Sequence, residues 1–207
     1  MMRHIPRKAA ERGNSMIELA LCMTFLVPLV LGSMVVGIDM GRSLQVSQVA
    51  RDTAHMFARS TDFSLPGTQD LVVKIAAGLG MTRTGGNGVV ILSRILQVGD
   101  QQCTDGGVSI ASCTNRTRAV VTQRIVIGNT AFAASKFATP TSSLLNSDGT
   151  IDAADYLKNS SVVATNFSST LPMLDGDIAY MVECYFQSAG ILMSQSDTRL
   201  LYARSIF

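Results

Sequence analysis

Hydrophobic residues dominate one stretch near the start of the chain. Residues 19–38 contain no charged side chain, and a helix of twenty residues rises about 30 Å, the thickness of a hydrocarbon core. A secretory signal peptide has a shorter apolar core and a small-residue cleavage site, whereas this run passes directly into Asp39 and Arg42. The stretch therefore predicts a membrane-spanning helix.

The helical pattern continues beyond the charged residues that end this run. Apolar or small residues recur there every three or four positions, which is the spacing of one face of an amphipathic helix. They are Val46, Val49, Ala50, Thr53, Ala54 and Phe57. Because no proline occurs between Pro28 and Pro66, we expect one helix over residues 14–59, about 70 Å long. Its first half would lie in lipid and its second half against an outer domain.

The membrane half contains two features that predict contact with another helix. Pro28 lacks a backbone N–H and should kink the helix, with a hydroxyl such as that of Thr24 satisfying the freed carbonyl. Ser33, Gly37 and Gly41 lie four residues apart on one face, where small side chains let a second helix approach closely. Glycine is also common in membrane helices without such a role, so both interpretations stay open.

Beyond residue 60 the pattern changes to short elements. Helical spacing of apolar residues predicts a short helix at residues 70–79, and a second is expected near residues 151–157. Clusters of β-branched and apolar residues predict strands at residues 89–98, 119–127, 177–187 and 199–207. The predicted fold class is α+β, with a long N-terminal transmembrane and amphipathic α-helix packed on a small, mostly antiparallel β-sheet.

The distribution of charge separates the first 13 residues from the rest of the chain. The net charge is +2, but residues 1–13 hold four basic side chains against Glu11, so this leader carries +3 and the remainder −1. Basic residues before a membrane helix favour a cytoplasmic N-terminus, which would place the outer domain, residues 60–207, in a periplasm. No basic patch occurs outside the leader, which argues against a nucleic-acid partner. The expected organisation is a leader (1–13), the long helix (14–59) and the outer domain.

The four cysteines are expected to differ in state. Cys103 and Cys113 flank a loop rich in Gly, Ser and Asp, and an exported domain meets an oxidising compartment, so a disulfide is expected between them. Closing a loop of this size would stabilise the protein by roughly 2 to 3 kcal/mol. Cys22 is expected to pack in the membrane helix, and Cys184 to be a buried free thiol in a strand.

Residues 146–155 resemble an EF-hand calcium loop. The candidate oxygen ligands are Asn146, Asp148, Asp152 and Asp155. The first loop position would be Leu144, which cannot bind a metal, so a turn followed by a helix capped by Asp152 is the favoured interpretation. No nucleophile–base pair, phosphate loop or zinc spacing is visible, so neither an enzyme nor a cofactor is predicted.

A glycine and a glutamate stand between the basic leader and the apolar run, at Gly13 and Glu18 in the segment Gly-Asn-Ser-Met-Ile-Glu. This arrangement resembles the cleavage region of type IV prepilins, in which a membrane aspartyl peptidase cuts after the glycine. The resemblance implies a processing site between Gly13 and Asn14. Glu18, fifth in the mature chain, would then pair with the N-terminal ammonium of an adjacent subunit, which relieves two desolvated charges.

The first quarter of the chain is similar to the TadE-like minor pilins, or pseudopilins, of the tight-adherence (Tad) pilus. In that family an apolar run with a central Pro-Leu leads into an amphipathic helix that ends in alanine and arginine. The corresponding pairs here are Pro28-Leu29, Ala50-Arg51 and Ala58-Arg59. Larger TadG-like relatives carry a von Willebrand A-type domain, whose Asp-x-Ser-x-Ser motif is not completed at Asp62, so that variant is excluded.

The resemblance implies a single-pass protein of the bacterial inner membrane that takes part in assembly or priming of a Tad-type pilus, for adhesion or secretion, and that can enter the extracellular pilus. Its partners would be a prepilin peptidase, the major pilin and other minor pilins, inner-membrane platform proteins and membrane lipid. The residues alone leave a second hypothesis open, an uncleaved, signal-anchored periplasmic binding domain that depends on calcium.

Overall fold

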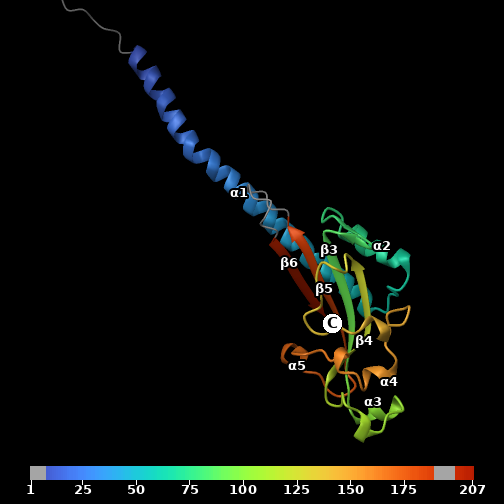
Figure 1. Cartoon of the computed structure of the whole chain (residues 1–207). Coiled ribbons are helices and arrows are strands. Elements are labelled where there is room, and N and C mark those ends of the chain that lie inside the picture. The colour runs from blue at the N-terminus through green and yellow to red at the C-terminus, as the bar shows by residue number, and fades with distance from the viewer. Residues whose placement is uncertain (1–7, 189–198) are drawn as a thin grey trace, which may run out of the picture.

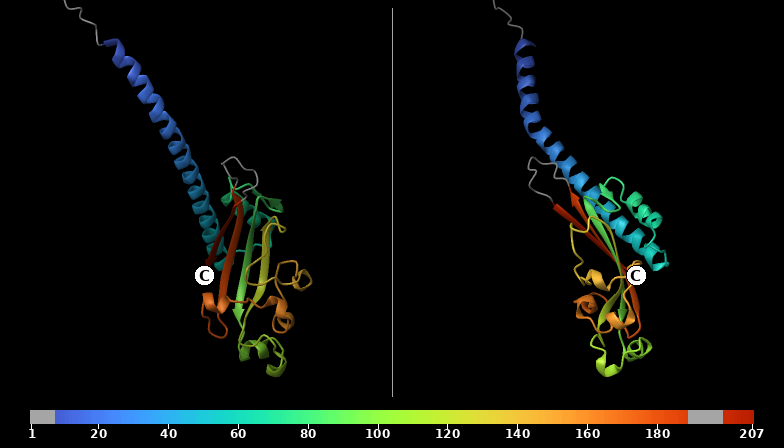
Figure 2. Two further views of the ribbon diagram at one scale, coloured as in Figure 1. Left: turned by 60° about the vertical axis from the view of Figure 1, so that its left-hand side comes forward. Right: turned by 45° about the vertical axis from the view of Figure 1, so that its right-hand side comes forward.

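One long helix dominates the molecule. The structure, a computed structural model, describes residues 8–188 and 199–207, so the start of the expected leader lies outside the described part. Helix α1 (Lys8–Ala58) has 51 residues, about 76 Å of length, and continues through Pro28. It projects from the outer domain as a curved rod (Figure 1, Figure 2). The single long helix predicted from the sequence is thereby confirmed.

Both ends of α1 differ slightly from the prediction. The described helix already includes Lys8, six residues before the predicted start at residue 14, because alanine, lysine, glutamate and arginine in the expected leader are strong helix formers. At the other end Ser60 has a φ of 61°, and the N–H groups of Ser60 and Thr61 donate to the carbonyls of Phe57 and Met56. This left-handed turn ends the helix one residue before the predicted position.

Four antiparallel strands form the sheet on which α1 packs. Across the sheet their order is β4 (Ala119–Gly128), β3 (Gly88–Gln97), β5 (Ile178–Ser188) and β6 (Arg199–Ile206). All four predicted strands are confirmed to within one residue at either end. Pairing between β3 and β4 moves from Arg94 opposite Gln123 to Ile95 opposite Val121, which leaves Thr122 as a β-bulge.

One face of the sheet packs against the second half of α1. The six predicted positions of the amphipathic face are all buried, namely Val46, Val49, Ala50, Thr53, Ala54 and Phe57. All of them except Thr53 form one apolar cluster with side chains of β3, β4 and β5 such as Leu92, Ile127, Val182 and Phe186. Because α1 itself supplies this core, the outer domain and α1 form a single α+β unit.

A short helix and a small hairpin cover the edge of this core. Helix α2 (Pro66–Ile75) begins four residues before the predicted start, because proline at the first helical position has the backbone angle that a helix needs. It also ends earlier, since Gly78 and Gly80 adopt positive φ angles. Strands β1 (Met81–Thr82) and β2 (Gly85–Gly86), which the sequence analysis did not predict, pair beyond it.

The opposite face of the sheet is covered by irregular chain. Six short helical segments lie there or nearby: α3 (Asp100–Asp105), η1 (Ile110–Ser112), η2 (Ser142–Leu144), α4 (Ala153–Tyr156), η3 (Ser160–Val162) and α5 (Phe167–Thr170). Only α4 was predicted. Phe137, Leu157 and Phe167 from this layer pack against the sheet. The predicted disulfide between Cys103 and Cys113 joins α3 to η1, and Cys184 is a buried free thiol, as predicted.

Candidate functional site

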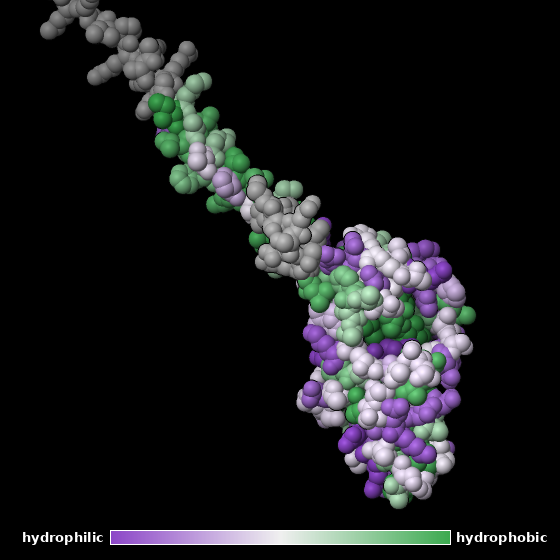
Figure 3. All heavy atoms as spheres, in the orientation of Figure 1, coloured by the Kyte–Doolittle hydropathy of each residue, from purple (hydrophilic) through white to green (hydrophobic). Residues whose placement is uncertain are grey.

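The first half of α1 exposes apolar side chains on all sides. Phe25 is 76% exposed and Leu29 is 71% exposed, and Figure 3 shows a hydrophobic rod leading to a mixed, largely polar domain. An 18-residue window of the helix has a mean hydropathy of 2.4, and none of it is buried within the molecule. The helix of a soluble core would be buried, so this half of α1 is compatible with a membrane anchor.

The expected processing residues lie near the start of this apolar half of α1. Gly13 and Asn14 are within α1, although the surroundings of their side chains lie outside the described part. Glu18 is exposed, between Ile17 and Leu19, which are themselves 63% and 58% exposed. A helix rises about 6 Å over four residues, so the Glu18 carboxylate stands one turn beyond the backbone nitrogen of Asn14.

Three small residues lie on the outer surface of the same helix. At Gly37 and Gly41 an added Cβ would meet nothing within 4 Å, and the hydroxyl of Ser33 donates back to the carbonyl of Val30 at 2.8 Å. The surface at these positions therefore remains accessible to a second helix, and contact there stays a prediction.

The expected role of Thr24 beside Pro28 is wrong. Its hydroxyl donates to the carbonyl of Ala20 at 2.9 Å, one turn back along α1. The carbonyl that Pro28 leaves without its helical donor is four residues before the proline, and that is the carbonyl of Thr24 itself. A hydroxyl that points toward the preceding turn cannot reach it.

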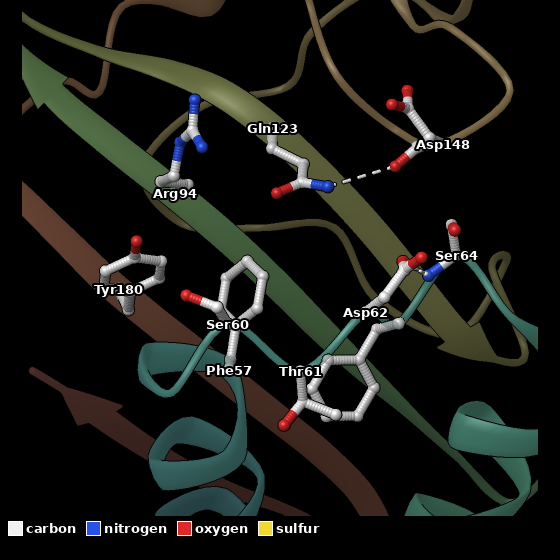
Figure 4. Close-up of a pocket in the computed structure, with 10 residues that line it drawn as sticks. Phe57, Ser60, Thr61, Asp62, Ser64, Arg94, Gln123, Asp148 and Tyr180 are labelled. Carbon is white, nitrogen blue, oxygen red and sulfur yellow. Dashed lines mark hydrogen bonds between the residues drawn. The ribbon is translucent and has the colours of Figure 1, made fainter.

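A cleft of about 280 Å³ opens where α1 ends and no longer covers the sheet. Figure 4 shows Arg94, Gln123 and Tyr180 rising from the sheet, with Asp62 and Asp148 on the two flanking loops. Hydrogen bonds from Ser64 lower the pKa of Asp62, and those from Thr150 lower the pKa of Asp148. Both carboxylates are therefore ionised at neutral pH and give the cleft a polar, partly anionic lining.

The calcium-loop candidates form a closed turn. Asp148 Oδ1 accepts hydrogen bonds from the backbone N–H and the hydroxyl of Thr150, at 3.0 and 2.6 Å. Asp152 Oδ1 accepts from Asn146 Nδ2 at 3.0 Å. Asp152 is the N-cap residue of α4, but its side chain does not bond to the helix, so the predicted capping contact is wrong.

These hydrogen bonds use carboxylate oxygens that a metal would need. Asp155 lies separately in the first turn of α4. Among the described residues, no group of three His, Cys, Asp or Glu side chains is placed to hold a metal ion. The geometry therefore favours the turn over the calcium loop.

Sequence analysis missed a buried carboxylate on the other face of the sheet. Glu183 in β5 is 0% exposed. Its Oε1 accepts hydrogen bonds from the Tyr185 hydroxyl at 3.0 Å, the Lys136 N–H at 3.2 Å and the Tyr202 hydroxyl at 3.4 Å. Its Oε2 accepts from the hydroxyl of Ser135. A buried charge of this kind requires such partners, because desolvation without them costs several kcal/mol.

The carboxylate perturbs the groups around it. Burial, and then the charge of Glu183, raise the pKa of Tyr202 to about 12 and raise the pKa of Tyr185 further. Burial likewise raises the pKa of the Cys184 thiol, which makes it unreactive. Burial lowers the pKa of Arg124 to about 10, an effect that the nearby charge of Glu183 opposes.

The sequence contained only a weak indication of this cluster. Met181, Glu183 and Tyr185 share one side of β5, so the period of two placed a charge on a face with large apolar neighbours. The same alternation also occurs on an exposed face of a sheet. It indicates burial of Glu183 only once residues 129–139 are known to cover this face.

Comparisons with known proteins identify no relative. No protein-family model matches the chain, and no curated protein or solved structure matches it.

Proposed function

We propose that the protein is a TadE-like minor pilin, or pseudopilin, anchored in the bacterial inner membrane and used to assemble or prime a Tad-type pilus. One observation carries the proposal: α1 is a single helix whose unburied apolar half bears Glu18 and whose other half forms the core of the outer domain. Such a subunit can leave a bilayer and enter a helical filament core without refolding. The part of the helix that changes its surroundings contributes nothing to the sheet domain.

The chemistry at the start of α1 supports the same proposal. A carboxylate at the edge of an apolar anchor costs free energy, less at the interface than the roughly 2.5 to 3.5 kcal/mol at a helix centre. Cleavage between Gly13 and Asn14 would create an ammonium one turn away from Glu18. Pairing Glu18 with the ammonium of a neighbouring subunit removes that cost for both charges and fixes an axial stagger between the helices.

The proposed partners follow from this cycle. A prepilin peptidase would cut the leader, the major pilin and other minor pilins would pack along α1, and platform proteins of the inner membrane would extract the subunit. The leader would face the cytoplasm and the sheet domain the periplasm, since basic residues precede the anchor. The role requires no catalytic group in the subunit itself.

Mass spectrometry of the protein from cells that contain a prepilin peptidase tests the processing step. The expected mature chain begins at Asn14, and Gly13→Ala should retain the leader. An intact leader on the wild-type chain would instead support a signal-anchored binding domain, for which the cleft beside Asp62 and Asp148 is the specific observation.

Substitution of Glu18 tests the pairing step separately. Glu18→Gln should still be cut, because the peptidase site is unchanged. It should enter filaments at no more than about one tenth of the wild-type level, as expected for the loss of about 1.4 kcal/mol of charge pairing. Asp52→Asn, which removes an exposed acid from the second half of α1, is the matched control and should assemble normally. Normal assembly of Glu18→Gln, measured by immunoblotting of sheared pili, would contradict the pairing.

A further inference from the structure

A row of polar side chains crosses the floor of the cleft at the end of α1. Arg94 in β3 lies opposite Tyr180 in β5 on one side and opposite Gln123 in β4 on the other. Side chains that face each other across antiparallel strands stand about 5 Å apart, so the three are direct neighbours. Figure 4 shows Asp62 and Asp148 beyond the Gln123 end of this row.

The Arg94 end of the row supplies hydrogen-bond donors. Arg94 Nε donates to Thr122 Oγ1 at 3.0 Å, which orients the guanidinium. Neither Nη atom has a hydrogen-bond partner in the described part of the chain, and neither of the ion pairs found there within 4.0 Å involves Arg94. The hydroxyl of Tyr180 is likewise unpaired among these residues (Figure 4). An oriented guanidinium beside a free hydroxyl is a set of donors suited to a carboxylate.

The opposite end of the cleft is anionic. Asp62 and Asp148 are both exposed, and they are close enough for the charge of Asp148 to act on Asp62. Hydrogen bonds from the N–H groups of Ser64 and Thr150, at 2.8 and 3.0 Å, hold the two carboxylates in place. Neither carboxylate forms an ion pair with a cation of the described residues. This end is therefore suited to an ammonium group.

The opposite charges of the two ends restrict the class of ligand. A ligand with positive charge alone would be repelled by Arg94, and one with negative charge alone would be repelled by Asp62 and Asp148. A zwitterion can pair with both ends at once. Ligand pockets usually measure about 300 to 1,000 Å³. A cleft of about 280 Å³ therefore suits a small zwitterion.

The spacing of the row sets the length of that ligand. Gln123 stands between Arg94 and Asp148, and its Nε2 donates to the Asp148 carbonyl at 3.1 Å. Neighbouring strands are about 4.8 Å apart, so the two ends are separated by more than that distance. One amino-acid residue spans at most about 3.6 Å, whereas two extended residues span about 7 Å. The fitting zwitterion is therefore a dipeptide rather than a single α-amino acid.

We propose that this cleft binds short zwitterionic peptides of dipeptide size, with the peptide carboxylate at Arg94 and Tyr180 and the peptide ammonium between Asp62 and Asp148. The side-chain oxygen of Gln123 accepts no hydrogen bond from the described residues and lies between the two ends, where it can accept from the peptide N–H. The site lies in the outer domain, so it does not depend on cleavage of the leader or on assembly into a pilus.

Nuclear magnetic resonance of the full chain in detergent micelles tests the site with glycylglycine. The amide signals of Ser64 and Thr150 should shift saturably, because these N–H groups donate to the carboxylates that receive the ammonium. N-acetyl-glycylglycine lacks the ammonium and glycylglycinamide lacks the carboxylate, so each should bind about tenfold more weakly or worse. Equal binding of either blocked peptide or of free glycine would overturn the proposal, as would the absence of a saturable shift with glycylglycine.

Arg94→Gln tests the carboxylate end. It should weaken glycylglycine binding about tenfold and abolish the preference for glycylglycine over glycylglycinamide, because the lost guanidinium is the partner of the carboxylate. A purely structural change would weaken both peptides alike. Arg118→Gln removes an exposed arginine outside the cleft and is the matched control, which should leave both affinities unchanged.

Asp62→Asn tests the ammonium end and should fold even if Arg94→Gln does not. Asp62 lies on an exposed loop, and asparagine retains an oxygen that can accept from the Ser64 N–H. The preference for glycylglycine over its N-acetyl form should fall several-fold, whereas Asp105→Asn, which changes an exposed acid outside the cleft, should leave it unchanged. A preference that survives in both Arg94→Gln and Asp62→Asn would show that the peptides bind elsewhere.

Discussion

At the scale of single residues, Gly88 at the start of β3 shows how closely the sheet is packed. A Cβ there would stand 2.9 Å from the carbonyl oxygen of Tyr185 and closer still to the ring of Phe186. Gly88→Ala should therefore lower the free energy of unfolding by about 1 to 3 kcal/mol, as other overpacked sites do. Gly67→Ala in α2, where a Cβ meets nothing within 4 Å, is the control and should be neutral or slightly stabilising in thermal unfolding followed by circular dichroism.

The groups around Glu183 predict sensitivity to alkaline pH. In the unfolded chain Cys184 loses its proton near pH 9 and Tyr202 near pH 10, whereas in the folded protein the pKa of Cys184 is raised and that of Tyr202 is about 12. Between about pH 9 and 12 the unfolded state therefore sheds protons that the folded state keeps. As the pH rises through that window, these two groups, together with Tyr185, lower the free energy of unfolding. Below the window they cause no dependence of stability on pH.

Arg124 acts in the opposite direction. Its lowered pKa of about 10 means that the folded state loses this proton first, which adds stability as the pH rises above 10. One such group stands against three, so the midpoint of thermal unfolding should still fall above pH 9. Tyr202→Phe should make the decline shallower. A midpoint that stays constant up to pH 11 would contradict this account.

At the scale of elements, the sequence predicted what depends on local pattern. The four strands follow from local clusters of β-branched and apolar residues, and their bounds were correct to within one residue. The buried face of α1 follows from helical spacing, and all six of its predicted positions are buried. The start of α2 was missed because the spacing of apolar residues begins only at residue 70, whereas the helix already begins at Pro66, where proline fits the first turn. The role of Glu183 was missed because its burial depends on residues 129–139, which are distant in sequence and have no regular pattern of their own.

The second half of α1 is the element whose packing can be tested most simply. Val49 is 0% exposed in the core between α1 and the sheet, whereas Leu44, less than two turns earlier, is 63% exposed. Val49→Ala should destabilise the sheet domain by about 2 kcal/mol through lost contacts and a residual cavity. Leu44→Ala should change stability by less than about 0.5 kcal/mol. Similar losses in both variants, measured by denaturant unfolding in micelles, would mean that the helix does not supply the core.

At the scale of the whole molecule, the apolar first half of α1 and the sheet domain are joined by unbroken helix rather than by a linker. Leu44→Pro should bend this junction, because proline removes a helical hydrogen bond and its ring clashes with the preceding turn. The sheet domain should remain folded, since the buried face of α1 begins at Val46. Spin labels on Cys22 and on an introduced Leu71→Cys should report a broader distance distribution than in the Leu44→Ala background. An equally narrow distribution would show that the junction tolerates the proline without bending.

The seating of α1 along β5 and β6 also determines how the molecule bears a mechanical load. A force that pulls the sheet domain along the axis of α1 loads the packed side chains from Val46 to Phe57 in shear. Their contacts must then break together rather than one after another. No extensible tether lies in between to absorb the strain. Tension applied at the far end of the domain is therefore transmitted directly to the apolar first half of α1.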